Sequence, residues 1–147
     1  MASTSRETAR KAFAALLDTA LVDTNIVEAV YDYQVGDFDG KASTVVVTSG
    51  GIMRVQQSLG TCWHNTYRLD CYLFVLYADP DSSWTEADAE DKIDDIEAAF
   101  ADVVMTGTND AWDGTPEYAE QTALGVVQVG GVSYRRELVS ILLEKTE

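Results

Sequence analysis

The sequence predicts an α+β fold: a largely antiparallel or mixed sheet of about four to five strands packed by two helices, with a projecting loop or hairpin at about residues 50–66. Three patterns predict this fold. Residues 67–78 are apolar enough to be buried on both faces of a sheet. An acidic stretch with helical periodicity follows them, and two β-rich runs near the end of the chain flank a Gly-Gly pair.

Length and composition predict one domain over residues 1–147. The chain has 147 residues, 46% of them hydrophobic, which is close to the common size of a domain with one core. Only two prolines and ten glycines occur, so no stretch has the composition of a linker or a repeat array.

The first helix is predicted at about residues 5–21. Thr4 and Glu7 have the spacing of a capping box, in which a carboxylate follows a hydroxyl three residues later. Apolar residues then recur at helical spacing and form one face, namely Ala9, Phe13, Leu16, Leu17, Ala20 and Leu21.

Two strands and an arm are predicted next. Residues 26–33 and 44–48 are rich in β-branched and aromatic side chains, and Gly50-Gly51 ends the second strand. Residues 50–66 are polar and flanked by glycines. They predict either a short strand or one arm of a projecting hairpin.

The strand predicted at residues 67–78 has two different faces. One face is apolar throughout and comprises Tyr67, Leu69, Cys71, Leu73, Val75 and Tyr77. The other face begins with Arg68 and Asp70 and becomes apolar at Tyr72, Phe74 and Leu76. We therefore expect the strand to begin with one solvated face and to end covered on both, by a helix or by another subunit.

The second helix is predicted to begin at Thr85 and to end at Gly107. Thr85 and the acids after it suit a helix N-terminus, and glycine is a common C-terminal stop. The expected buried stripe is Ala89, Ile93, Ile96, Phe100, Val103 and Val104.

The last third of the chain predicts a loop and a hairpin. Residues 108–120 read as a loop that holds Trp112. Residues 122–129 and 132–143 read as two strands joined through Gly130-Gly131, which is a hairpin signal.

The net charge of −15 disfavours ordinary nucleic-acid binding. The ten basic residues are scattered and form no stripe that would neutralise phosphates. An acidic surface gives solubility, and it also suits a place where DNA must pass without binding.

Cysteine usage and hydropathy predict a soluble protein made in the cytoplasm. Cys62 and Cys71 form no CxxC motif, and the polar N-terminus has no pattern of a signal peptide, so reduced thiols are expected. The longest apolar run, residues 71–78, is too short to cross a membrane.

No catalytic, cofactor-binding or metal site is predicted. His64 is the sole histidine, and its spacing from Cys62 in a glycine-flanked segment is a weak pattern for nucleophilic catalysis. Zinc would need four good ligands, and three Cys or His residues are present. Residues 79–90 match some positions of an EF-hand loop, but Trp84 occupies the position that requires glycine.

Three tryptophans, Trp63, Trp84 and Trp112, fall in predicted loops. Such a residue either folds back on the core or anchors a partner. We expect at least one of them to contact another chain.

Six ordered fragments cover nearly the whole chain: 30–33 (VYDY), 36–40 (GDFDG), 45–51 (VVVTSGG), 73–78 (LFVLYA), 84–91 (WTEADAED) and 130–137 (GGVSYRRE). Together, in this order and spacing, they resemble the tail terminator (tail completion) proteins of long-tailed, siphovirus-like bacteriophages. The motifs are structural, so the resemblance implies no catalytic residues and no cofactor.

The resemblance implies a structural virion protein at the head–tail junction, made in the host cytoplasm. Such proteins form a hexameric ring on the last ring of the tail tube, stop tube growth and join the head-side neck or connector protein. DNA would pass through the ring without specific binding. The resemblance also implies subunit contacts by the arm. Together with the tryptophans of the predicted loops, this gives the candidate interface residues Ile52, Met53, Arg54, Trp63, Trp84 and Trp112.

Three alternatives remain open from the sequence. The nearest is another neck component or head completion protein. A different class is a small acidic ligand-binding or enzymatic domain that uses His64, Cys62 and nearby carboxylates. A third is an acidic mimic of DNA that occupies a basic partner.

Overall fold

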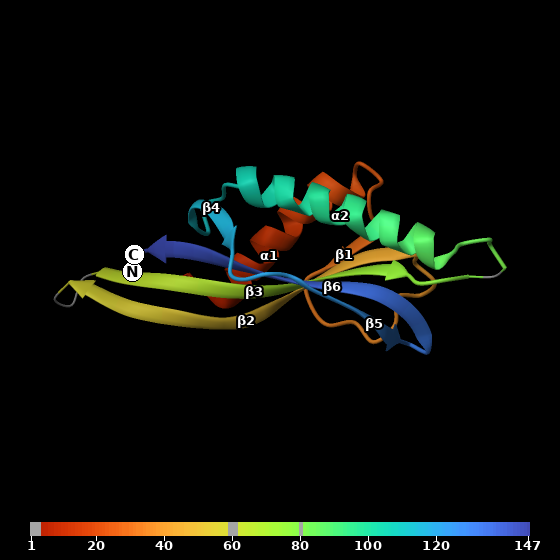
Figure 1. The fold of residues 1–147 in the computed structure, drawn as a ribbon. Helices are drawn as coiled ribbons and strands as arrows, with labels where there is room; N and C mark the ends of the chain where they lie inside the picture. The colour runs from red at the N-terminus through yellow and green to blue at the C-terminus, as the bar shows by residue number, and fades with distance from the viewer. Residues whose placement is uncertain (1–3, 59–61, 80) are drawn as a thin grey trace.

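The computed structural model describes residues 4–58, 62–79 and 81–147. Two helices lie on one face of a sheet (Figure 1). The helices are α1 (Arg6–Leu17) and α2 (Glu86–Thr106), and one π-helical turn, η1 (Asp18–Val22), continues α1. The strands are β1 (Ala29–Tyr31), β2 (Ser43–Ser58), β3 (Cys62–Leu76), β4 (Asp113–Tyr118), β5 (Ala123–Val129) and β6 (Val132–Thr146). The predicted α+β fold is confirmed.

The sheet is mixed and runs in the order β1-β2-β3-β6-β4, while β5 also pairs with β6. β1 and β2 are parallel, and the other pairs are antiparallel. β4 and β5 pair with successive parts of β6, on the side that β3 does not occupy. One edge of the sheet is therefore formed by β1 and β2, and the other by β4 and β5.

β2 and β3 form a long hairpin that projects beyond the helices (Figure 1). Their pairing begins at Ser43 opposite Val75 and continues to Ser58 opposite Cys62. β6 accompanies β3 as far as the pair of Thr146 with His64, so the base of the arm has three strands. The predicted projecting hairpin at about residues 50–66 is confirmed, while its tip at 59–61 lies outside the described residues.

The main core lies between the sheet and the helices. α1 packs on the β1 and β2 side, and α2 packs on β3, β6 and β4. The apolar face predicted for the third strand is buried here, at Tyr67, Leu69, Cys71, Leu73 and Val75. The predicted stripe of α2 is also buried, at Ala89, Ile93, Ile96, Phe100, Val103 and Val104.

A second, smaller core covers the opposite face of the sheet at one end. It consists of Phe38, Val46, Phe74 and Tyr134, with the rings of Phe38 and Phe74 4.9 Å apart. The strand end is thus covered on both faces, as predicted. The second cover is the segment after β1 that carries Phe38, and neither a helix nor another subunit is needed for it.

Helix boundaries follow their capping residues. Thr85 and Asp88 form a capping box at the predicted start of α2, and Gly107 ends that helix as predicted. The prediction for α1 is wrong by one residue, because Ser5 is the N-cap and its hydroxyl accepts a hydrogen bond from the N–H of Thr8. No helix among the described residues is both long and apolar enough to cross a membrane.

The prediction of a loop at residues 108–120 is wrong in part, because these residues include β4. This strand pairs with β6 through a shift in register between Asp113 and Glu117. Its sequence includes Gly114 and Pro116, so it has no alternation of apolar and polar residues. The pairing depends on a neighbour distant in sequence.

Candidate assembly surface

The structure brings four of the six candidate residues together on the arm. Ile52, Met53 and Arg54 lie on β2, and Trp63 lies on the facing part of β3. Met53 is 66% exposed and Trp63 is 41% exposed, although both are large apolar side chains. The arm therefore presents apolar surface where the fold itself provides no cover.

The other two tryptophans belong to the body of the protein. Trp84 is half-buried against the main core, and its Nε1 donates a hydrogen bond to the carbonyl of Leu76 at 2.6 Å. Trp112 is 2% exposed, packs 6.1 Å from the ring of Phe13 and donates to the carbonyl of Gly107 at 3.2 Å. The expectation that Trp112 offers surface to a partner is wrong, because its ring and its N–H are both satisfied inside the chain.

The two faces of the arm differ because side chains alternate along a strand. Ile52, Arg54 and Trp63 lie on the face that carries α1, in register with the buried Tyr67. Met53 lies on the opposite face, together with the half-exposed Val55. Each face of the arm thus carries exposed apolar side chains of its own.

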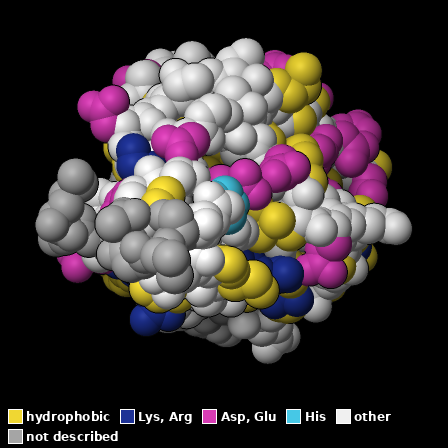
Figure 2. Space-filling view, turned by 90° about the vertical axis from the view of Figure 1, so that its left-hand side faces the viewer, with side chains coloured by type: hydrophobic (Ala, Val, Ile, Leu, Met, Phe, Trp, Pro, Cys, Tyr) yellow, Lys and Arg dark blue, Asp and Glu magenta, His cyan; other side chains and the backbone are white. Residues whose placement is uncertain are grey.

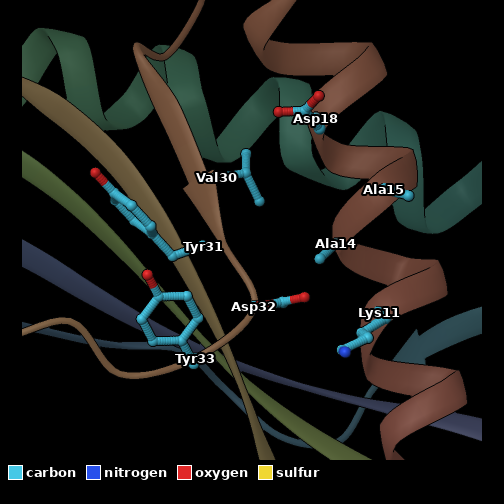
Figure 3. A pocket seen from close by; sticks show the side chains of 8 residues that line it. All are labelled: Lys11, Ala14, Ala15, Asp18, Val30, Tyr31, Asp32 and Tyr33. Carbon is cyan, nitrogen blue, oxygen red and sulfur yellow. The ribbon is translucent and has the colours of Figure 1, made fainter.

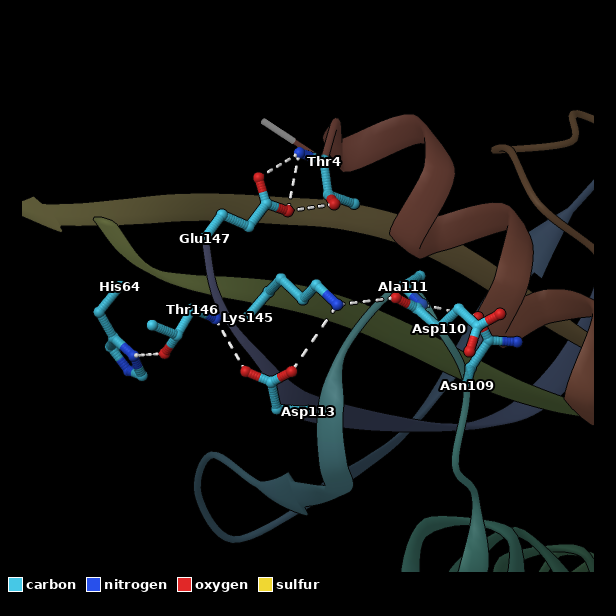
Figure 4. Close-up of polar contacts among 9 residues, drawn as sticks. All are labelled: Thr4, His64, Asn109, Asp110, Ala111, Asp113, Lys145, Thr146 and Glu147. Atoms are coloured by element: carbon cyan, nitrogen blue, oxygen red, sulfur yellow. Dashed lines mark hydrogen bonds and ion pairs between the residues drawn. The ribbon is translucent and has the colours of Figure 1, made fainter. Parts of the chain in front are cut away.

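The base of the arm is fixed by contacts with the segment before α1. The guanidinium of Arg54 lies 5.9 Å from the centre of the Tyr67 ring and donates to the carbonyl of Thr4 at 3.3 Å. The Tyr67 hydroxyl donates to the same carbonyl at 2.6 Å. The N–H of Thr4 in turn donates to the Glu147 carboxylate at 2.9 Å (Figure 4).

β6 is held at the arm by a second set of polar contacts (Figure 4). The N–H of Thr146 donates to the carboxylate of Asp113 at 2.8 Å, and Lys145 donates to the carbonyl of Asp110 at 3.0 Å. The Thr146 hydroxyl lies 3.1 Å from Nδ1 of His64. These contacts join β3, β6 and the segment around β4. They hold the base of the arm in place.

A shallow hollow of about 430 Å³ opens on the face of the arm opposite α1. Met53, Thr66, Arg68 and Leu142 line it together with the backbone around Gly50-Gly51. Its lining is mostly apolar, so it suits an apolar side chain of a partner.

Beside this hollow, Arg68 is the centre of a polar network. Its guanidinium pairs with Glu120, lies 3.3 Å from an oxygen of Asp70 and donates to the Ser140 hydroxyl at 3.0 Å. The pKa of Arg68 is raised, first by its hydrogen bond to Glu120. A side chain at Gly50 would approach Arg68 and Asp70 to within 2.9 Å, so glycine leaves the space for this network.

A second hollow, of about 280 Å³, lies between α1 and the segment that contains β1 (Figure 3). Lys11 and Asp18 border it from α1 and its continuation, and Asp32 borders it from the other wall. Tyr31 and Tyr33 form the rest of that wall. It is open and small, with charges of both signs, which gives it no preference for one kind of ligand.

The end of the molecule at the arm shows how charges and apolar groups are distributed. Viewed from that end, hydrophobic and basic side chains gather in the lower half, and acidic side chains lie mainly above them and to the right (Figure 2). This end of the molecule is therefore not uniformly acidic, despite the net charge of −15.

Neither the cysteines nor the histidine line the two hollows described above. Cys71 is buried in the main core, and burial raises the pKa of its thiol, so it stays protonated and unreactive. His64 contacts Thr146 and lies 3.8 Å from the carboxylate of Glu144. Within residues 4–58, 62–79 and 81–147, no three His, Cys, Asp or Glu side chains are arranged to hold a metal ion.

The chain matches no protein-family model and no curated protein sequence.

Proposed function

We propose that this protein is a structural component of a phage virion, a tail terminator. It caps the head-proximal end of the tail tube as a ring, ends tube polymerisation and forms the surface that joins the tail to the neck. The observation that carries the proposal is the projecting arm, which has exposed Met53, Val55 and Trp63 on a rigid three-stranded base. Exposed apolar groups on an ordered arm are typical of a surface that is buried in an assembly.

The order of the sequence fragments supports the same proposal. The fragment at residues 45–51 leads into the arm, and the fragment at 73–78 supplies the strand end that is covered on both faces. The fragment at 130–137 begins at the turn between β5 and β6. Features that resemble a tail terminator thus fall on the elements that build the sheet and the arm.

The partners follow from this role. Copies of the chain form a closed homohexamer through head-to-tail contacts, because a closed ring needs two different complementary surfaces on each subunit. The ring contacts the tail tube protein on one side and a head-side neck protein on the other. The acidic exterior suits a ring through which DNA passes without binding.

The proposal is tested by the position of the protein in a phage particle. A cryo-EM reconstruction of the phage that encodes the chain should place a ring of it between the last tube ring and the neck. Chemical crosslinking of the same particles should join it directly to the tail tube protein. Density on the head side alone, with no crosslink to the tube, would assign it instead to another neck component.

A pair of variants tests the arm itself. Met53→Glu combined with Trp63→Ser should leave the fold intact and give tails of abnormal length, because an uncapped tube continues to grow. Met105→Glu is the matched control, since Met105 is 70% exposed at the end of α2 and is not part of the arm. Normal tails from the arm variant would contradict the role given to the arm.

A further inference from the structure

We propose that the two opposite edges of this protein bind each other in neighbouring copies. The α1 and β2 edge of one copy would dock on the α2 and β5 edge of the next. This inference rests on the proposed ring and names the surfaces that form it. The charges of the two edges, their exposed apolar side chains and their positions in the sheet support this pairing.

The first surface, the basic flank, consists of Arg6, Arg10, Lys11 and Arg54. These four are all the basic residues of segments 4–17 and 43–58, and Glu7 is the one acidic residue there. The guanidinium of Arg10 lies 3.4 Å from the Ser49 hydroxyl, which places it over β2. In the rest of the chain, acidic residues far outnumber basic residues. This grouping of cations is therefore unusual for the molecule.

The strand beneath the basic flank has a free edge. β1 pairs with β2 at Thr44, Val45 and Val46, and in the described part of the chain no strand pairs with that side of β2 beyond them. Unpaired backbone groups of an edge strand are a surface on which another chain can bind.

The second surface, the acidic flank, consists of Glu90, Asp94 and Glu97 of α2 with Leu124 and Val126 of β5. The three acids recur at i, i+4 and i+7, so they share one side of the helix. Contacts identify that side as the one toward β6 and β4. Glu90 pairs with Arg135 at 2.9 Å, and Glu97 accepts a hydrogen bond from the Tyr118 hydroxyl at 3.4 Å.

Leu124 and Val126 lie beside these acids and are uncovered. Val127 and Val129 pack into the second core on the far face of the sheet, so the alternating residues Leu124 and Val126 point to the helix side. They are 51% and 48% exposed. Apolar side chains bordered by acids have the composition of an interface with a charged rim.

Arg135 neutralises only Glu90 of the acidic flank, and among the described residues Asp94 and Glu97 form no ion pair. Glu137 of β6 is 6% exposed, and its pKa is raised by burial and further by the charges of Glu97 and Asp94. A cation brought to this flank from outside would offset that repulsion.

The two flanks lie at opposite edges of the sheet and carry opposite charges. A two-fold dimer through either flank would place like charges against each other, which costs energy. Contact of one flank with the other pairs Arg10 and Arg54 with the acids of α2. Such a contact leaves a free flank at each end of the pair, so it can continue until a ring closes.

Charge reversal tests the pairing. Arg10→Glu with Arg54→Glu makes both flanks acidic, and Asp94→Lys with Glu97→Lys makes both basic. Each variant alone should self-associate at least about tenfold more weakly than wild type at low ionic strength, measured by sedimentation and native mass spectrometry. An equimolar mixture of the two variants should recover assembly, with the two chains alternating in even-numbered species.

Matched controls separate pairing from net charge. Lys41→Glu with Lys92→Glu changes the net charge as the first variant does, and Asp91→Lys with Asp95→Lys changes it as the second does. Asp91 and Asp95 are exposed on a different side of α2 from the acidic flank. Both controls should associate like wild type.

Variants that change no charge test the same contact even if a charge reversal disturbs folding. Leu124→Ser with Val126→Ser should weaken association at least about tenfold, whereas Met105→Ser should not. Circular dichroism of each variant confirms its fold.

Three results would overturn the inference: a mixture of reversed variants that stays dissociated, controls that lose association equally, or a wild-type chain that is monomeric at low ionic strength. None of these results would contradict the proposed position of the protein at the head–tail junction. The position in the particle therefore tests the proposed function separately from the surfaces named here.

Discussion

At the scale of single residues, Asn65 is a polar side chain in a buried position where no residue that the structure describes offers its amide a hydrogen bond. It lies between Arg54 and Lys145 in the register of the arm, on the side of α1. It is fully buried, and neither its amide oxygen nor its amide nitrogen has a hydrogen-bond partner among the described residues. An unpartnered buried amide costs stability that an apolar side chain of the same shape would not.

We therefore expect Asn65→Leu to raise the free energy of unfolding by about 1 kcal/mol, measured by urea denaturation. Asn109→Leu is the contrasting substitution, because the side-chain oxygen of Asn109 accepts a hydrogen bond from the N–H of Ala111 at 2.9 Å. It should lower stability. A loss of stability in Asn65→Leu would show that the amide is satisfied in the folded protein.

Glu137 gives a prediction with a defined dependence on pH. Because burial raises the pKa of this carboxyl, the folded state holds its proton more tightly than the unfolded state does. Its contribution to stability is therefore full below the ordinary pKa of 4.5 and is lost as the pH rises through the raised value.

Glu137→Gln should accordingly raise the melting temperature at neutral pH and have little effect below the ordinary pKa. Thermal unfolding at a series of pH values checks this. Glu117→Gln, on the exposed part of β4, is the control and should not show the same trend. An equal effect of Glu137→Gln at every pH would rule out ionisation as its cause.

At the scale of elements, the arm depends on a bend in β2 at Gly50-Gly51. The pairing of β2 with β3 shifts in register between Ser49 and Gly51. Gly51 has a φ of 124°, a conformation that residues with a Cβ rarely adopt. The glycine thus permits the bulge from which the arm departs.

Gly51→Ala should destabilise the protein by about 1–3 kcal/mol, because the backbone there would be strained. Gly36→Ala is the matched control, since a Cβ at Gly36 meets no atom within 4 Å and its φ is not in the positive range. Chemical denaturation of the two variants gives the comparison. Equal stability of both would mean that the bulge tolerates a side chain.

The elements differ in how well the sequence predicts them. Local signals predicted the start of α2 at Thr85, its end at Gly107 and the turn at Gly130-Gly131, where both glycines have positive φ. The strand at 67–78 was predicted from its apolar residues, and one of its faces is buried under the helices from Tyr67 to Val75. These signals depend only on residues close in sequence.

Other elements depend on partners distant in sequence, and the sequence predicts them in part or not at all. The strand predicted at residues 26–33 is confirmed only over the three residues of β1, and the unpredicted β4 exists because β6 offers it an edge. The positions of Leu124 and Val126 beside α2 follow from the same pairing of β5 with β6. The acidic flank could therefore not be assembled from the sequence, although the arm residues could be named from the resemblance.

At the scale of the whole molecule, one aromatic cluster joins the two helices to the segment before β4. The ring of Phe13 on α1 lies 5.9 Å from Phe100 on α2 and 6.1 Å from Trp112. All three are buried. The cluster fixes the helix layer, and with it the distance between the basic and the acidic flank.

Trp112→Ala should lower the free energy of unfolding by about 3–5 kcal/mol, because it leaves a cavity in this cluster. Trp63→Ala should change stability by less than about 0.5 kcal/mol, since Trp63 is exposed, and should instead impair assembly. Thermal denaturation and tail length, measured on both variants, separate the two roles. A large loss of stability in Trp63→Ala would contradict its place on a contact surface.

The free edge of β2 has a consequence for the solubility of the unassembled chain. From Ala42 to Trp63 the sequence has a single charged side chain, that of Arg54. A long edge strand that is nearly free of charge is prone to pair with other copies of itself into fibrils. Arg54 and the bulge before it interrupt that stretch, as gatekeeper positions do. An uncharged residue at position 54 would therefore favour amyloid-like aggregation of newly made protein.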